Sequence, residues 1–184
     1  MENAHRRKKQ PGIVRRALLD HAARLVVEEG LAAVTVQAVS DAAGVTKGGF
    51  MHHFPSKQAL ITAVFEDLLG QIDRDLDARM AGDPEPWGSF TRAYVEAVLD
   101  MVPRGDGGPL AALSLSWLTD AGLRTLWADW FAERLRRHDA TDGAVSLAVV
   151  RLAADGLWLS DLAGIAVADC NALRRHLVEA TRPA

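Results

Sequence analysis

Apolar residues along this chain recur at helical rather than strand spacing. From Ile13 to Glu29 they fall on one stripe, with Pro11 and Gly12 before it and Gly30 after it as start and stop signals. No run alternates strictly between apolar and polar residues, and no Asn-Gly or Asp-Gly turn lies between β-branched stretches. The pattern therefore predicts an all-α protein.

Two short helices are predicted after the first one. Thr35 can cap a helix that ends at Gly44, and Thr46 can cap another that ends before Pro55. The Gly-Val-Thr between them suits a helix-turn-helix, because glycine permits a left-handed turn, valine fills the angle between the helices and threonine caps the second. In such a motif the second helix lies in the major groove of DNA, although a purely structural helical hairpin can carry the same residues.

The rest of the chain continues the helical pattern. Ser56 opens a longer helix, which breaks at residues 81–86, and a further helix carries Trp87. Residues 103–109, with three glycines, are predicted to form a loop. More helices are expected near residues 110–118, 121–138, 142–165 and 169–181, which makes about nine in all.

Composition places the chain among folded proteins of a reducing compartment. Of the 184 residues, 49% are hydrophobic and 24% are charged, with both signs mixed. No run approaches the roughly 20 apolar residues of a membrane-spanning helix, and the basic run Arg6–Lys9 is not followed by the apolar stretch of a signal peptide. Cys170 is the single cysteine and cannot form an internal disulfide. We therefore expect a cytoplasmic protein with no membrane partner.

The net charge of −3 conceals an uneven distribution. Residues 1–57 carry nine Lys or Arg against five acidic residues, a local charge of +4, whereas the remainder carries −7. The basic part contains the predicted helix-turn-helix, so it is the candidate for binding double-stranded DNA. The run Arg6–Lys9 is either a solvated tail or an arm that contacts DNA.

The segment from Thr46 to Lys57 resembles the TetR family of regulators. In that family the third helix typically reads Ser-Lys-Gly-Thr-Leu-Tyr-His-His-Phe, followed by a short turn and Lys. This chain has Thr-Lys-Gly-Gly-Phe-Met-His-His-Phe, followed by Pro-Ser-Lys, and the resemblance is specific over about residues 12–72. It implies a three-helix DNA-binding domain at residues 1–57 and a helical ligand-binding and dimerisation domain at residues 58–184.

The resemblance also implies roles for individual residues, with Phe50 and Phe54 as core residues that fix the third helix. The candidate phosphate contacts are Thr35, Gln37, Thr46 and Lys57, and the candidates for base edges or adjoining backbone are Lys47, Gly48, Gly49 and His52, with His53 beside them. The two histidines do not predict a metal site, because adjacent helical side chains point about 100° apart and no ligand one turn further on completes the set.

Two of the departures from the family pattern each remove a polar side chain. Gly49 stands where threonine is usual and Met51 where tyrosine is usual, so one small polar side chain and one phosphate-binding hydroxyl are missing. A glycine in a helix interior costs about 1 kcal/mol relative to alanine, so Gly48 and Gly49 weaken the isolated helix. We expect this helix to gain order on DNA.

The C-terminal part concentrates aromatic side chains, including all five tryptophans. The candidate ligand-binding residues are Trp87, Phe90, Tyr94, Trp117, Trp127 and Trp158, with Trp130 and Phe131 beside them. The same rings can equally form an ordinary core. Asp155 and Asp161 lie within an apolar helix, where each can pair with a cationic ligand or with Arg151, or can face solvent.

By resemblance, the expected partners are a near-palindromic operator, a small-molecule effector and a second copy of the chain. A two-fold dimer is expected to use the last two helices, because its symmetry matches a palindromic site. The predicted interface residues are Leu147, Val150, Ala154, Leu157 and Asp161 on the penultimate helix, and Leu173, Leu177 and Val178 on the last.

The expected function is that of a repressor released from its operator by a small apolar or aromatic effector. Two alternatives stay open: a DNA-binding regulator without an effector, and a helical enzyme or carrier that uses a C-terminal pocket. The sequence has no nucleophile elbow and no phosphate-binding glycine loop, so we expect no catalytic residue and no cofactor.

Overall fold

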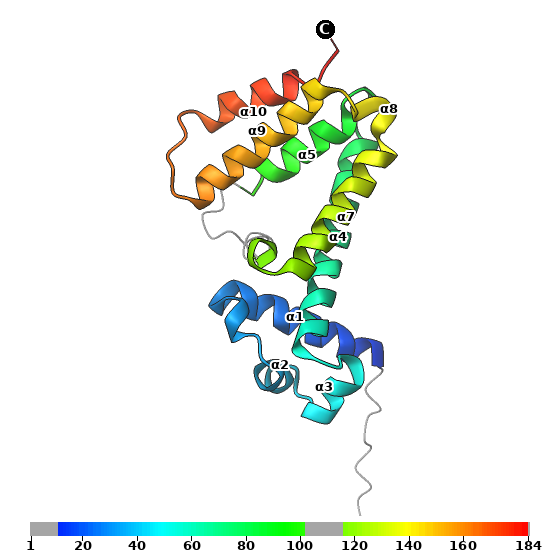
Figure 1. Cartoon of the computed structure of the whole chain (residues 1–184), viewed down its shortest axis with the longest axis vertical. Coiled ribbons are helices and arrows are strands. Elements are labelled where there is room, and N and C mark those ends of the chain that lie inside the picture. Colours follow the sequence, from blue (N-terminus) through cyan, green and yellow to red (C-terminus); the bar gives the residue numbers. More distant parts are fainter. Residues whose placement is uncertain (1–10, 102–115, 184) are drawn as a thin grey trace, which may run out of the picture. The chain divides into compact units, whose positions relative to one another are not determined.

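The computed structural model describes residues 11–101 and 116–183, and every regular element in these ranges is helical (Figure 1). This confirms the all-α fold class. The chain divides into two compact units, Met1–Glu66 and Asp67–Ala184, and helix α4 (Lys57–Ala81) belongs in part to each. The domain boundary predicted after Lys57 falls at the first residue of α4 and stays a prediction.

The N-terminal unit places one long helix and two short ones ahead of α4. The long helix, α1, buries a stripe that includes Val14, Leu18, Ala22 and Val26, as the apolar spacing predicts, and it contacts α2. The elements are α1 (Pro11–Glu29), the 3-10 helix η1 (Leu31–Ala33), α2 (Val36–Ala43) and α3 (Lys47–His53).

The C-terminal unit is built around α5, the most thoroughly buried helix of the described chain. Figure 1 shows α5, α9 and α10 side by side, and all three are in contact. Residues 116–119 are also helical, while the helix predicted near 110–118 lies mostly outside the described residues. The bounds are α5 (Ser89–Leu99), α7 (Ala121–Arg137), α8 (Asp139–Asp142), α9 (Val145–Leu162) and α10 (Cys170–Glu179).

The start of α5 is set by a close approach of two backbone segments. Gly88 has φ 70°, and a Cβ at this position would lie 2.4 Å from the carbonyl oxygen of Thr181. Arg92, one turn into α5, donates to the Thr181 hydroxyl at 3.1 Å and so holds the same contact. The helix therefore begins at Ser89, and Trp87 precedes it, which corrects the prediction that Trp87 belongs to the helix.

The helix predicted over residues 142–165 is interrupted near its start. The Asp142 side chain is buried and accepts a hydrogen bond of 2.8 Å from the Thr91 backbone N–H, which ends α8. A Cβ at Gly143 would lie 2.6 Å from the backbone oxygen of Asp139, so the chain turns closely here before α9 begins at Val145. The break thus combines a side-chain contact with another helix and a close turn at Gly143, in a segment whose apolar periodicity continues.

The stripe of α9 predicted as a dimer interface is buried within its own subunit. Leu147, Val150 and Ala154 are 1%, 5% and 0% exposed, and α9 packs against α5. These residues are therefore unavailable to a partner, and the predicted interface is wrong in this respect. α9 is apolar on more than one face, so its periodicity does not identify which face remains exposed.

Candidate nucleic-acid interface and ligand cavity

The connection between α2 and α3 has the local geometry that its sequence predicts. The Thr35 hydroxyl accepts a 3.0 Å hydrogen bond from the Ala38 N–H at the start of α2, and the Thr46 hydroxyl accepts one of 3.1 Å from the Gly49 N–H in α3. Between the helices, Gly44 adopts the left-handed conformation with φ 62° and ψ 39°. The two helices are in contact, and together they form a helix-turn-helix.

Aromatic anchors fix α3 in the N-terminal unit. Phe50 is fully buried, and its ring lies 6.0 Å from that of Phe54, which is 3% exposed. The Arg15 guanidinium of α1 lies over the Phe54 ring at 5.1 Å from its centroid. Because α3 contains Gly48 and Gly49, these packing contacts contribute more to its position than its own helical propensity does.

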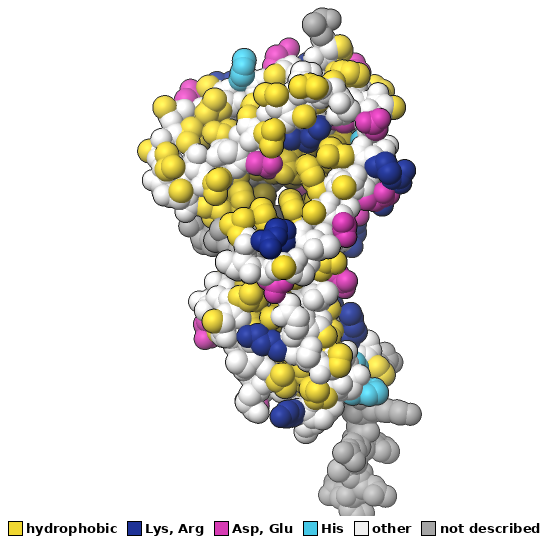
Figure 2. Space-filling view, in the orientation of Figure 1, with side chains coloured by type: hydrophobic (Ala, Val, Ile, Leu, Met, Phe, Trp, Pro, Cys, Tyr) yellow, Lys and Arg dark blue, Asp and Glu magenta, His cyan; other side chains and the backbone are white. Residues whose placement is uncertain are grey.

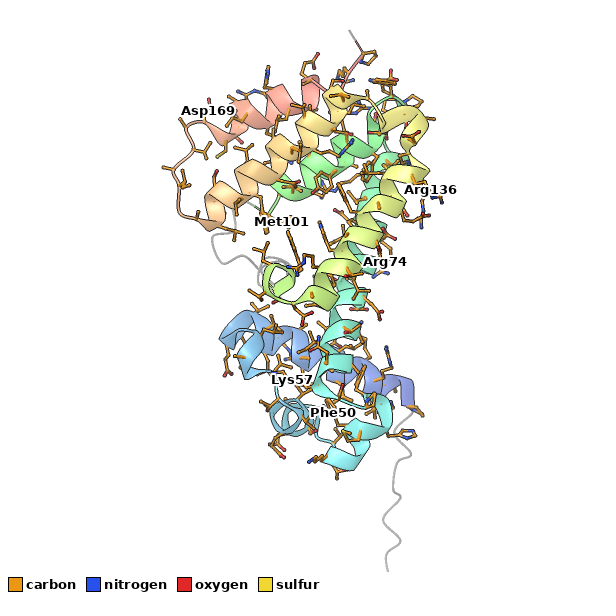
Figure 3. The ribbon with its side chains drawn as sticks, viewed as in Figure 1. Phe50, Lys57, Arg74, Met101, Arg136 and Asp169 are labelled. Carbon is orange, nitrogen blue, oxygen red and sulfur yellow. The ribbon has the colours of Figure 1, made fainter. Side chains whose placement is uncertain are left out.

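The predicted DNA-contacting residues are all exposed or partly exposed. Figure 3 labels two residues of this region, Phe50 on α3 and Lys57 at the start of α4. The exposed candidates are Thr35, Gln37, Thr46, Lys47, Gly48 and His52, and the partly exposed ones are Gly49, His53 and Lys57. The Gln37 amide donates one of its two N–H groups to Asp41 at 2.8 Å. Contact with DNA stays a prediction for all nine.

A hydrophobic cavity of about 500 Å³ lies within the C-terminal unit. Figure 2 shows hydrophobic side chains gathered around a hollow on this face of the unit. α4, α5, α7, α9 and the 116–119 segment contribute its walls. The lining residues are Ile72, Asp75, Leu76, Arg79, Tyr94, Ala97, Val98, Asp100, Met101, Trp117, Leu118, Trp127, Phe131, Asp155, Trp158 and Leu159. The volume is in the range of about 300–1,000 Å³ that is usual for sites of drug-sized ligands.

Four of the six candidate ligand residues line this cavity: Tyr94, Trp117, Trp127 and Trp158. The structure does not place Trp87 or Phe90 there. Phe90 is fully buried and stacks on His138, with the ring centroids 5.1 Å apart, so it belongs to the core. Trp87 lies ahead of α5 with 38% of its surface exposed, because the helix begins only after Gly88.

At one wall of the cavity, an aspartate carboxyl group is hydrogen-bonded to a tyrosine hydroxyl. The Tyr94 hydroxyl on α5 donates a 2.5 Å hydrogen bond to Asp155 on α9. Burial raises the pKa of the Asp155 carboxyl, while the hydrogen bond from Tyr94 and the positive charge of Arg151 oppose this shift. Burial and the neighbouring charge of Asp155 raise the pKa of the Tyr94 hydroxyl, so it remains a hydrogen-bond donor.

Another part of the cavity lining carries an ion-pair network. Arg79 donates to Asp75 at 2.8 Å and to Asp100 at 3.0 Å. Asp100 also accepts from Arg174 of α10 at 2.6 Å, and Arg174 pairs in addition with Glu96. Partial burial acts against ionisation of Asp100, yet the hydrogen bonds from Arg174 and Arg79 hold the pKa of this carboxyl below its ordinary value.

Sequence reasoning missed three charged lining residues, namely Asp75 and Arg79 on α4 and Asp100 directly after α5. An Asp and an Arg four residues apart are the usual pattern of a solvated helix face, so nothing local marks them as cavity residues. Asp155 carries a detectable signal, because an acid within an apolar helix is unusual. The structure places the Asp155 carboxyl at the cavity, where it accepts a hydrogen bond from Tyr94, a partner that the sequence does not suggest.

Residues 11–101 and 116–183 contain neither a metal-binding cluster nor a membrane-spanning helix. Within these ranges no group of three or more His, Cys, Asp or Glu side chains is arranged to hold a metal ion. Within the same part of the chain, no helix has the length and apolar character needed to cross a membrane.

The fold and these sites define a helix-turn-helix protein with a second, helical unit that contains a cavity. Sequence comparison agrees with this class: the family described as bacterial regulatory proteins, tetR family, matches residues 18–64. The family described as the tetracyclin repressor-like C-terminal domain matches residues 88–182, which is more than half of the chain. The protein therefore belongs to the tetR family.

Curated relatives match about half of this chain. The HTH-type transcriptional repressor KstR2 of Mycolicibacterium smegmatis is 40% identical over 89 residues, covering 46% of this chain and 43% of the relative. The HTH-type transcriptional regulator BetI of Rhizobium meliloti is 34% identical over 92 residues, covering 50% of this chain and 43% of the relative. The chain thus matches less than half the length of these relatives.

Solved structures extend the likeness of fold over both units. The crystal structure of the multidrug binding protein EbrR complexed with malachite green has a TM-score of 0.72. It covers 92% of this chain and 98% of EbrR, at 21% sequence identity. At this identity the likeness establishes a shared fold.

Proposed function

We propose that the protein is a ligand-responsive transcriptional regulator, most simply a repressor. It binds a near-palindromic operator as a homodimer in the cytoplasm and is released by a small apolar or aromatic effector. The observation that carries the proposal is that one chain contains both a capped helix-turn-helix with exposed polar residues and a hydrophobic cavity of about 500 Å³. The complex of EbrR with malachite green supports an effector of small-molecule size.

The proposed mechanism is a shift between two dimer states with different spacing of the recognition helices. An effector that prefers the wrongly spaced state weakens operator binding, and the operator weakens effector binding by the same factor. α4 offers a continuous connection, because it runs unbroken from Lys57, four residues after α3, to Arg79 at the cavity. A regulator without an effector is the weaker candidate, because such a protein needs no cavity and a densely packed C-terminal unit would be expected.

Selection of bound sites from random duplex DNA tests the operator-binding half of the proposal. We expect near-palindromic sites whose half-sites are about one helical turn apart, or a multiple of it, with affinity that falls steeply as salt rises. Lys57→Ala should weaken all sites about tenfold, because loss of a phosphate contact is insensitive to sequence. Lys47→Ala should also change the selected sequence, because a base-edge contact is worth about 1–3 kcal/mol of discrimination.

Arg74→Ala is the matched control for these variants. Arg74 is an exposed basic residue of the same helix as Lys57, but it lies in the C-terminal unit. Its removal should leave both affinity and sequence preference unchanged. Failure of the wild-type protein to enrich any sequence would refute the proposed function.

The dimer is proposed to form through the exposed face of α9. Val145, Val149, Leu152 and Leu159 are 80%, 59%, 70% and 55% exposed, and their spacing places them on one stripe of the helix. Gly156 lies on the same stripe, and a Cβ at this position would meet nothing within 4 Å, so a partner helix can approach closely. This apolar stripe on an otherwise packed helix suits contact with its own copy across a two-fold axis.

Leu152→Glu should convert the protein to a monomer in sedimentation at micromolar concentration. The symmetric contact would bring two carboxylates together out of water, which disfavours association. Val27→Glu is the control, because Val27 is a 37% exposed apolar residue of the N-terminal unit, whereas the proposed interface belongs to the C-terminal unit. A Leu152→Glu protein that stays dimeric would place the interface elsewhere.

A further inference from the structure

Among the described residues, no basic side chain forms a hydrogen bond or ion pair with Asp155, an acidic group of the cavity wall. Asp155 lines the cavity from α9, and its Oδ1 accepts a hydrogen bond from the Tyr94 hydroxyl, which is neutral. Arg151, one turn earlier on α9, is the nearby cation, but its guanidinium is committed elsewhere. It donates to the Thr91 hydroxyl at 2.6 Å and to the Asp142 backbone oxygen at 3.2 Å.

The positive charge of Arg151 is balanced by the buried carboxylate of Asp142. Thr91 connects the two, because its hydroxyl accepts from Arg151 and donates to Asp142 at 2.6 Å. This network lies in the interior of the C-terminal unit, where Asp142 is 1% exposed and Arg151 6% exposed. Asp155 is therefore the charged group of α9 that is left for a ligand in the cavity.

The charges of the cavity lining also argue against an anionic ligand. Among the described lining residues there are three acids, Asp75, Asp100 and Asp155, and one basic residue, Arg79. Arg79 is already paired with Asp75 and Asp100, at 2.8 Å and 3.0 Å. An incoming anion would have to break these pairs, whereas a cation meets an acidic lining.

The aromatic rings of the cavity favour a flat ligand. The Trp127 ring lies nearly parallel to the rings of Trp117 and Phe131, with interplanar angles of 3° and 7° and centroids 6.1 Å and 6.2 Å apart. Trp158 lines the cavity from α9, three residues after Asp155. Aromatic faces attract cations through their quadrupole as well as through apolar contact.

We infer that the cavity binds an aromatic monocation and that Asp155 is the carboxylate that holds its positive charge. The inference rests on the proposed function, which requires an effector, and adds the chemical class of that effector and the residue that selects it. The apolar walls take the ring system, while the Tyr94 hydroxyl holds the Asp155 carboxylate in place.

A pair of probes of nearly equal shape tests the charge. 10-Methylacridinium is a permanent cation, and acridine is neutral at mildly alkaline pH. Binding is measured for both by equilibrium dialysis and by quenching of tryptophan fluorescence, with the full-length protein. The wild-type protein should bind the cation at least about tenfold more tightly than acridine, a difference of about 1.4 kcal/mol.

Asp155→Asn should remove this preference, lowering the affinity for the cation about tenfold and leaving that for acridine unchanged. Asp129→Asn is the matched control, because Asp129 is an exposed acid of α7 in the same unit and is not among the residues that line the cavity. It should change neither affinity by more than about twofold. Thermal unfolding and operator affinity of both variants report whether they are folded.

Each other outcome overturns the inference. Equal binding of both probes to the wild-type protein, or binding of neither, shows that the cavity does not select an aromatic cation. If the Asp155→Asn variant binds the cation as tightly as the wild type does, another group interacts with the charge of the ligand. If this variant binds neither probe, Asp155 only maintains the shape of the cavity. None of these results affects operator selection, so the proposed function stands or fails separately.

Discussion

Phe50→Ala is expected to unfold the recognition helix and abolish operator binding. The Phe50 side chain is fully buried, and truncation of such a residue to alanine costs about 3–5 kcal/mol. α3 has only seven residues and includes Gly48 and Gly49, each worth about 1 kcal/mol less than alanine in a helix, so it has little stability of its own. Chemical denaturation measures the loss, and amide hydrogen exchange locates it in α3.

Met51→Ala is the control on the same helix. Met51 is 44% exposed, and a change at such a position should alter the free energy of unfolding by less than about 0.5 kcal/mol. It should also leave the exchange of α3 amides unchanged. A Phe50→Ala protein with the stability and operator affinity of the wild type would contradict the role of Phe50 as the anchor.

Asp142→Asn is expected to destabilise the C-terminal unit by about 3–5 kcal/mol, although the two side chains have nearly the same shape. Asp142 accepts from the Thr91 N–H and hydroxyl through Oδ1 and from the Thr141 hydroxyl at 2.8 Å through Oδ2. The amide removes the negative charge that balances Arg151 and turns one acceptor into a donor facing other donors. Thermal and chemical unfolding measure the effect.

Two further variants test whether the loss of stability in Asp142→Asn is caused by the loss of the negative charge. Asp139→Asn changes the exposed first residue of α8 and should cost less than about 0.5 kcal/mol. Asp142→Asn combined with Arg151→Met removes both charges, so the double variant should be more stable than the sum of the single changes predicts. Additive losses would show that the two charges are not coupled.

The helix-turn-helix is predictable from sequence because the interactions that form it are local. The hydroxyls of Thr35 and Thr46 bond to N–H groups three residues ahead, and the left-handed turn falls on Gly44, a residue type that adopts this conformation readily. The buried stripe of α1 follows from helical spacing in the same way. Elements whose controlling contacts lie within one helical turn can be identified from the order of residues.

The breaks between helices in the C-terminal unit depend on distant residues. α5 begins after Gly88 because the backbone of Thr181 lies against it, and α8 ends where Asp142 reaches Thr91, 51 residues away in the chain. The Asp142-Gly143 dipeptide is a local turn signal at this break, but the apolar periodicity through residues 142–165 does not reveal it. Trp87 is therefore placed outside the helix and away from the cavity by a contact that periodicity cannot reveal.

The sequence by itself determined the helical class, the DNA-binding motif and the concentration of aromatic residues in the C-terminal part. Only the tertiary structure decided which of these rings line a cavity, since this depends on contacts such as that of Tyr94 with Asp155, 61 residues apart. It also decided which apolar face of α9 is buried, with Val150 inside and Leu152 exposed. The physical reason is that helical spacing shows which residues share a face, whereas the neighbouring helices determine which face is covered.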